Sequence, residues 1–194
     1  MHPLNSDETA ITRFSGRWEF LSNFYRHPFA VAGTIYPTME HYFQAAKTGP
    51  ASAAIIVAAR SAADAKRLGR RCALREDWET VKLDVMRTGL RAKFAAGTRL
   101  GRLLLAPGDA ELVEGNEWGD RYWGMCGGVG ENYLGKLLTK IRDEAAGCVA
   151  LCFKEPWLEL ILLGLKTLET RTKCLRREGG TVVLTSSTVD EAAW

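Results

Sequence analysis

The sequence has no hydrophobic run long enough to cross a bilayer. Its longest apolar run, WLELILLGL, is interrupted by Glu159 and falls well short of the ~20 residues that a membrane helix needs. The amino end, MHPLNSDETAITRF, also lacks the apolar stretch of a secretory signal peptide. We therefore expect a cytoplasmic protein with no membrane partner.

Cysteine and histidine are too few and too scattered to indicate a metal site or a disulfide framework. The five cysteines include no CxxC pair, and the three histidines show no zinc-binding spacing. An excess of one charge is also missing, because 26 Lys and Arg oppose 23 Asp and Glu. The net charge of +3 forces no nucleic-acid or anionic-membrane partner but is compatible with a small anionic ligand.

What is present is enough apolar sequence for one folded domain, 46% of 194 residues. Periodicity and turn residues predict an α+β fold, a mainly helical single domain with short strands. Extended segments or strands are expected over 17–25, 28–37 and 110–115, with a hairpin turn at Ala32 and Gly33. Helices are expected over 38–47, 51–60, 61–70, 77–94, 99–105 and 131–146, the third begun by Ser61 and the fourth capped by Asp77.

A domain boundary is expected near Gly147, where the last of these helices closes and an apolar run of strand character begins. The sequence thus divides into a domain over 1–147 and a β segment over 148–194. The second part is short for an independent hydrophobic core. We expect it to dock, to pair with another chain or to stay loose.

The stretch YPTMEHYFQAAK combines core spacing with chemically active side chains. Thr38 is a good N-cap for a helix, and Glu40 falls in the first turn. The apolar stripe is Met39, Tyr42, Phe43 and Ala46, and a polar stripe beside it is Glu40, Gln44 and Lys47. Glu40 and Lys47 are then about 10 Å apart along the axis, wide enough for a small molecule between them. The alternative is that Glu40 serves only the helix dipole and that Lys47 only snorkels to solvent.

The segment NEWGDRYWG is too irregular to follow either periodicity. Aromatic faces stack on planar bases, while an amide and a carboxylate can bind sugar hydroxyls, so the composition indicates a nucleoside-like site. The residues concerned are Asn116, Trp118, Asp120, Tyr122 and Trp123. The CGGVGEN segment that follows could bind a phosphate through backbone N–H groups. Alternatively, the tryptophans fill the core and the glycines make turns.

Several separated motifs, in order, resemble the NADAR (YbiA-like) family over about residues 13–146. They are FLSNFY, YPTMEHYFQAAK, the A-x-x-LGR run ending at Arg70, DWETVKLDVMRTGLRAKF, NEWGDRYWG and GENYLGKLLTKIR. The resemblance implies an N-glycosidase that cleaves a bond between ribose and nitrogen. It implies two substrate classes without choosing between them: early riboflavin-pathway intermediates of the phosphoribosylamino-pyrimidine type, or ADP-ribosylated guanine in nucleic acid.

The resemblance also implies the roles of individual residues. The expected catalytic residues are Glu40, Lys47 and Asp120. The expected substrate-binding residues are Asn23, Tyr42, Gln44, Trp118, Trp123 and Asn132. Arg13 and Arg17 are candidates for phosphate contacts, with placement on the solvated surface as the alternative.

Hydrolysis of an N-glycoside needs a carboxylate that stabilises an oxocarbenium-like state and an acid for the leaving nitrogen, which Glu40 and Asp120 can supply. A Schiff base at Lys47, proposed for the family, is a further route. No metal or organic cofactor is required. One rival function is a non-catalytic ADP-ribose reader. Another is RNA binding by the tail, whose G-x-K-x-x-E-x-R motif over 164–171 resembles the opening of a truncated ASCH (PUA-like) domain.

Overall fold

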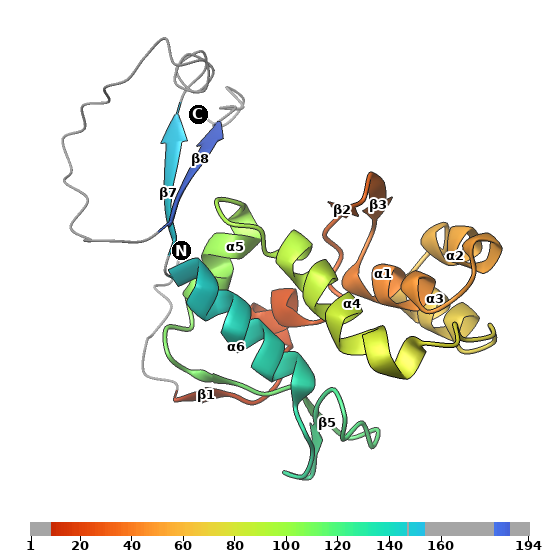
Figure 1. The fold of residues 1–194 in the computed structure, drawn as a ribbon. Coiled ribbons are helices and arrows are strands. Elements are labelled where there is room, and N and C mark those ends of the chain that lie inside the picture. Colours follow the sequence, from red (N-terminus) through yellow and green to blue (C-terminus); the bar gives the residue numbers. More distant parts are fainter. Residues whose placement is uncertain (1–8, 147, 154–180, 187–194) are drawn as a thin grey trace, which may run out of the picture.

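Helices dominate the computed structural model, which describes residues 9–146, 148–153 and 181–186 (Figure 1). The helices are η1 (Gly16–Leu21, a 3-10 helix), α1 (Met39–Ala46), α2 (Pro50–Val57), α3 (Ala62–Gly69), α4 (Trp78–Lys93), α5 (Arg99–Leu105) and α6 (Tyr133–Ala146). The strands are β1 (Ala10–Ile11), β2 (Phe29–Val31), β3 (Thr34–Tyr36), β4 (Glu111–Leu112), β5 (Gly115–Asn116), β6 (Met125–Cys126), β7 (Cys148–Phe153) and β8 (Thr181–Ser186). The expected α+β class, mainly helical with short strands, is confirmed.

The strands pair in twos and form no extended sheet within the described ranges. β2 and β3 form the antiparallel hairpin expected around Ala32 and Gly33. Both of these residues have positive φ, which a tight two-residue turn requires and which Gly33 adopts without strain. The pairs β1–β4, β5–β6 and β7–β8 are parallel, and the first and last of them join segments distant in sequence.

Side-chain caps fix the starts of two helices near the candidate site. The Thr38 hydroxyl accepts a hydrogen bond from the backbone N–H of His41 at the start of α1. At the start of α3, the Ser61 hydroxyl accepts one from the N–H of Asp64. Each cap satisfies a backbone donor that the helix itself leaves free, so both helices begin where the sequence predicts.

Two local predictions were wrong. The segment 17–25 begins with the 3-10 helix η1 instead of a strand, because three residues per turn bring Trp18 and Leu21 onto the same buried face. Asp77 precedes α4 as expected, but its carboxylate pairs with the guanidinium of Arg75 (2.5 Å) and caps no backbone N–H.

Helix α4 packs tightly on α1 at Gly89. A Cβ atom at this position would lie 2.5 Å from Cε of Met39 and 2.5 Å from Cδ1 of Tyr42, closer than real Cβ atoms approach. The absence of a side chain therefore lets the two helices meet. This contact buries the apolar face of α1 and leaves its polar face on the other side of the helix.

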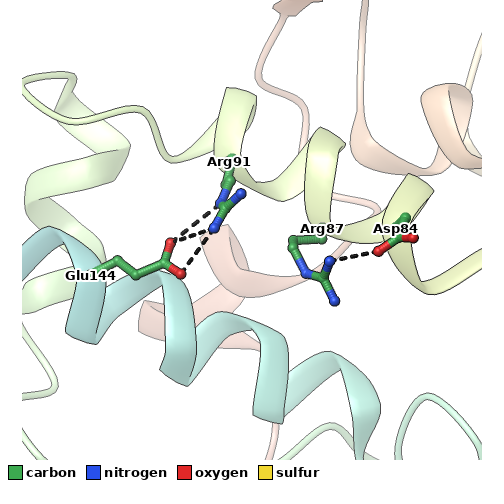
Figure 2. A network of polar contacts seen from close by, with 4 residues as sticks. All are labelled: Asp84, Arg87, Arg91 and Glu144. Atoms are coloured by element: carbon green, nitrogen blue, oxygen red, sulfur yellow. Dashed lines mark hydrogen bonds and ion pairs between the residues drawn. The ribbon is translucent and has the colours of Figure 1, made fainter.

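Ion pairs accompany the contact between α4 and α6. Arg91 on α4 binds both carboxylate oxygens of Glu144 on α6 (2.9 Å), and Arg87 binds Asp84 within α4 at 2.5 Å (Figure 2). These side chains are largely exposed, so each pair contributes only ~0–1 kcal/mol. The main stabilisation comes from the buried core beneath them.

Strand character after Gly147 is confirmed by β7, which pairs with β8 from Cys148 opposite Thr181 to Phe153 opposite Ser186. The ASCH-like motif over 164–171 lies outside the described residues. The boundary between 1–147 and 148–194 stays a prediction. None of the helices in the described ranges is both long and apolar enough to span a membrane.

Candidate active site

A cavity of about 710 Å³ opens beside the polar face of α1, between α3, α4 and the loop that follows β4. Its volume is in the range of ~300–1,000 Å³ that is typical of small-molecule sites. The residues that line it are Ser22, Asn23, Phe24, Glu40, Phe43, Gln44, Lys66, Arg70, Met86, Glu114, Trp118, Gly119, Asp120, Trp123 and Leu134. Six of the nine residues predicted from the sequence are among them.

Glu40 is the buried acid of the α1 wall. Its backbone N–H donates to the carbonyl of Asn23 (2.9 Å), and Nε2 of Gln44 donates to its Oε1 (2.7 Å). Burial raises the pKa of the Glu40 carboxyl, while the Gln44 hydrogen bond acts in the opposite direction. Oδ1 of Asn23 is buried without a hydrogen-bond partner among the described residues, which leaves an acceptor at the wall for a ligand.

Asp120, another residue that lines the cavity, is held by its own loop. Its Oδ1 accepts hydrogen bonds from the backbone N–H groups of Tyr122 (3.1 Å) and Trp123 (2.9 Å). Asn116 clamps the same residue, because its Oδ1 accepts from the Asp120 N–H and its Nδ2 donates to the Asp120 carbonyl. The loop is therefore rigid at its acidic residue without any regular secondary structure.

The two tryptophans of this loop have different environments. Trp123 packs its ring edge-on against Phe43 and against Tyr122, with centroids 5.2 and 5.0 Å apart. Trp118 is 67% exposed at the cavity mouth, and no aromatic contact of its ring is found among the described residues. Trp123 thus packs on the core, whereas stacking of the exposed Trp118 ring on a planar ligand stays a prediction.

Glu114, which the sequence analysis did not select, is a third carboxyl in the cavity. Burial and the nearby charge of Asp120 raise its pKa to about 7. Its main chain is fixed, since its N–H donates to Oδ1 of Asn132 and its carbonyl accepts from the Met125 N–H. A clue existed in the sequence: an acid two residues before Asn116, next to the loop already selected.

Three predicted site residues do not line the cavity. Oδ1 of Asn132 accepts from the N–H of Glu114 and its Nδ2 donates to the carbonyl of Leu112, so Asn132 fixes the main chain that carries Glu114. Tyr42 is buried among aromatic rings of the core, with Tyr36 5.1 Å away, and its ring packs against α4 at Gly89. Lys47 follows the end of α1 and is half-buried.

The position of Lys47 still places its amine within electrostatic reach of the cavity. Burial lowers its pKa, and the charges that act on it include those of Glu40, Lys66 and Arg70, all of which line the cavity. The amine thus has the lowered pKa expected from the sequence, but it lies beside the cavity.

A second lysine near the cavity, Lys93, was not among the residues selected from the sequence. Lys93 is only 1% exposed, and its Nζ donates to the carbonyl of Ser22 (2.8 Å), a residue of the cavity wall. Burial lowers its pKa to about 7, against the attraction of Glu114. A lysine on a helix usually has its amine in solvent, and nothing in the local sequence distinguishes Lys93 from such a lysine.

The remaining candidates lie away from the cavity. Arg13 pairs with the exposed Glu117, and Arg17 lies over the ring of Trp18 at 5.0 Å. In the glycine-rich segment, Gly130 and Glu131 line a different hollow against α6. In the part of the chain that the structure describes, no group of His, Cys, Asp and Glu side chains could hold a metal ion.

Comparison with known proteins identifies relatives. The model of the NADAR domain matches residues 11–145. N-glycosidase YbiA of Escherichia coli (strain K12) is 46% identical over 134 residues, covering 64% of this chain and 80% of the relative. An N-glycosidase of Nostoc punctiforme is 40% identical, covering 67% of this chain and 87% of its own. A riboflavin biosynthesis protein of Vibrio vulnificus is 41% identical, but the match spans only 35% of it.

The fold is shared as well. The NMR structure of E. coli YbiA superposes with a TM-score of 0.65 at 39% identity, covering 75% of this chain and 94% of that one. The match of the domain model covers more than half of the chain and includes every residue of the cavity. The chain therefore belongs to the NADAR domain family.

Proposed function

We propose that the protein is an N-glycosidase that hydrolyses the bond between ribose and a nitrogen of a nucleotide-like substrate. The observation that carries the proposal is the presence of three carboxyls, Glu40, Glu114 and Asp120, in one cavity of suitable size. Relatives named N-glycosidases support the reaction type. The name of the Vibrio relative supports a riboflavin-pathway substrate as one possibility.

Division of roles follows from the surroundings of each carboxyl. Glu114, with a pKa near 7, donates a proton to the leaving nitrogen as the bond between C1′ and nitrogen breaks. Asp120, fixed by two N–H groups, stabilises the positive charge that develops on the sugar. Water then attacks C1′ and transfers a proton to Glu40, and exchange with solvent deprotonates Glu40 and reprotonates Glu114.

The exposed ring of Trp118 provides the stacking surface for the base, and Asn23 provides an acceptor for a sugar hydroxyl. Base stacking on an aromatic side chain contributes ~1–3 kcal/mol. Such a surface would also serve a non-catalytic reader of ADP-ribose. The three carboxyls favour the enzyme, because a reader of an anionic ligand gains nothing from buried acids.

A covalent route through Lys47 is a second mechanism for the same reaction. When the sugar ring opens, C1′ becomes an imine carbon. The neutral amine of Lys47 adds to it, the base departs with a proton, and water later hydrolyses the new imine. Because Lys47 lies beside the cavity, its side chain has to swing toward C1′ for this to occur.

Two substrates test the function, and one variant tests the route. The full chain is incubated with ADP-ribosylated guanine in DNA and, separately, with a phosphoribosylamino-pyrimidine, and free base and sugar are measured. Release from either substrate supports the enzyme and names its class, whereas binding without release supports the reader. Lys47→Arg keeps the charge but cannot form an imine. Near-normal turnover in this variant would exclude the covalent route.

A further inference from the structure

A second hollow adjoins the cavity along α3. It has a volume of about 430 Å³ and shares Phe24, Lys66 and Arg70 with the cavity. Its other lining residues are Ala63, Arg67 and Arg71. The two spaces therefore border one another at the side chains of Phe24, Lys66 and Arg70.

The second hollow carries positive charge alone, whereas the cavity combines three carboxyls with Lys66 and Arg70. The carboxyls lie in the cavity, while the second hollow is lined by four cationic side chains and no acid. Of these four, only Arg67 forms an ion pair among the described residues, with Asp64 at 2.7 Å. Lys66, Arg70 and Arg71 have no acidic partner within 4 Å in the described part of the chain. Cations in the last turn of a helix offset its dipole, but the dipole does not explain why they line a hollow.

The seam between the two spaces, formed by Lys66 and Arg70, lies next to a tightly packed helix contact. A Cβ at Gly69 would lie 2.1 Å from Oε1 of Gln44, so α3 packs directly against the α1 wall. Lys66 and Arg70 flank this contact in sequence. The Nζ of Lys66 lies 5.4 Å from the centroid of the Phe24 ring, which holds the cation at the cavity edge.

We propose that Lys66 and Arg70 form a phosphate subsite that binds a phosphate ester of the substrate's ribose. The inference rests on the proposed function for the ribose, but the subsite itself requires no turnover. A phosphate at the seam satisfies both cations, and Arg can bind it through two parallel hydrogen bonds. The second hollow, with Arg71, holds whatever is attached beyond that phosphate. The protein thus selects phosphorylated ribosides over free nucleosides.

Binding of products separates this inference from catalysis. The full chain is titrated calorimetrically with ribose, ribose 5-phosphate and ADP-ribose, none of which needs to react. Wild-type protein should bind ribose 5-phosphate at least about tenfold more tightly than ribose. The double variant Lys66→Ala/Arg70→Ala should lose this preference and retain the affinity for ribose. Lys140→Ala, which removes an exposed cation on α6, is the matched control and should change neither affinity.

The ADP-ribose arm distinguishes a single phosphate from a diphosphate. If the ligand continues into the second hollow, Arg71→Ala should weaken ADP-ribose several-fold and leave ribose 5-phosphate unchanged. An unchanged preference for ribose 5-phosphate in the folded double variant, checked by its melting temperature, would overturn the subsite. Equal affinity of wild-type protein for ribose and ribose 5-phosphate would overturn it too. Absent hydrolysis with an intact phosphate preference would reject the proposed function alone.

Discussion

Nε2 of Gln44 donates a 2.7 Å hydrogen bond to Oε1 of Glu40, one helical turn earlier, and both side chains are buried in the cavity wall. The bond holds the carboxylate in one orientation and favours its charged form. It therefore links two polar residues of one helix face to the reaction that we propose.

Loss of this bond should change the pH dependence of turnover. The Gln44 hydrogen bond lowers the pKa of Glu40, so Gln44→Leu should raise it further. Because Glu40 accepts a proton from water in its charged form, the acidic limb of the pH–rate profile should move to higher pH. Turnover on the acidic limb should fall about tenfold at a given pH. A limb that stays in place in a folded Gln44→Leu protein would show that Glu40 is not the base.

Glu114 should set the alkaline limb of the same profile. It donates a proton, so turnover should fall as the pH rises through about 7, the raised pKa of this carboxyl. Glu114→Gln should lower turnover by about 10²–10⁴-fold and remove that limb. If the limb persists in Glu114→Gln, another group supplies the proton.

Lys93 should make stability depend on pH between about 7 and 10. Its pKa is lowered to about 7 in the folded protein, so the unfolded chain binds more protons in this range and wild-type stability falls as the pH falls. Lys93→Met removes this dependence. The difference in free energy of unfolding, variant minus wild type, should increase by on the order of 3 kcal/mol as the pH falls from 10 to 7. Below pH 7 this difference should stay constant.

Urea unfolding at several pH values measures this difference. The lost hydrogen bond to Ser22 lowers the stability of Lys93→Met by an amount that does not vary with pH, so the slope is decisive. Parallel curves for the two proteins would mean that Lys93 stays charged throughout.

The two tryptophans of the loop should respond in opposite ways. Trp118→Ala should leave the free energy of unfolding within about 0.5 kcal/mol of wild type and weaken substrate binding by about 1–3 kcal/mol, because the exposed ring serves only the ligand. Trp123→Ala should destabilise the fold by about 2–3 kcal/mol, because its ring packs on Phe43. Thermal unfolding and substrate titration of both variants check the contrast. Equal loss of stability in both would make Trp118 structural.

The helices near the site were predictable because their signals are local. Capping by Thr38 and Ser61 depends on residues within one turn, and the polar stripe of Glu40 and Gln44 follows from helical spacing. Lys47, the C-cap residue of α1, lies beside the cavity, and its role in the reaction stays a prediction. Helical spacing does not predict the surroundings of Tyr42, because they depend on how closely α4 approaches at Gly89, a contact between segments far apart in sequence.

The residues that the sequence analysis missed are those whose role depends on burial. Glu114 and Lys93 have pKa values near 7 only because the folded chain removes them from water. Neither belongs to a periodic pattern, and an acid or a lysine on its own usually indicates a solvated surface. The family resemblance pointed to segments that line the cavity, whereas the surroundings of individual side chains depend on tertiary contacts.

The most direct test of the central claim is to count free base and free sugar by mass spectrometry from a ribosylated-nitrogen substrate. Wild type, Glu40→Gln and Glu114→Gln are compared at equal concentration. We predict equimolar base and sugar from wild type, with release slowed by about 10²-fold or more in each variant while binding persists. The absence of release by wild type from both substrate classes, or release at the wild-type rate in both variants, would contradict the account.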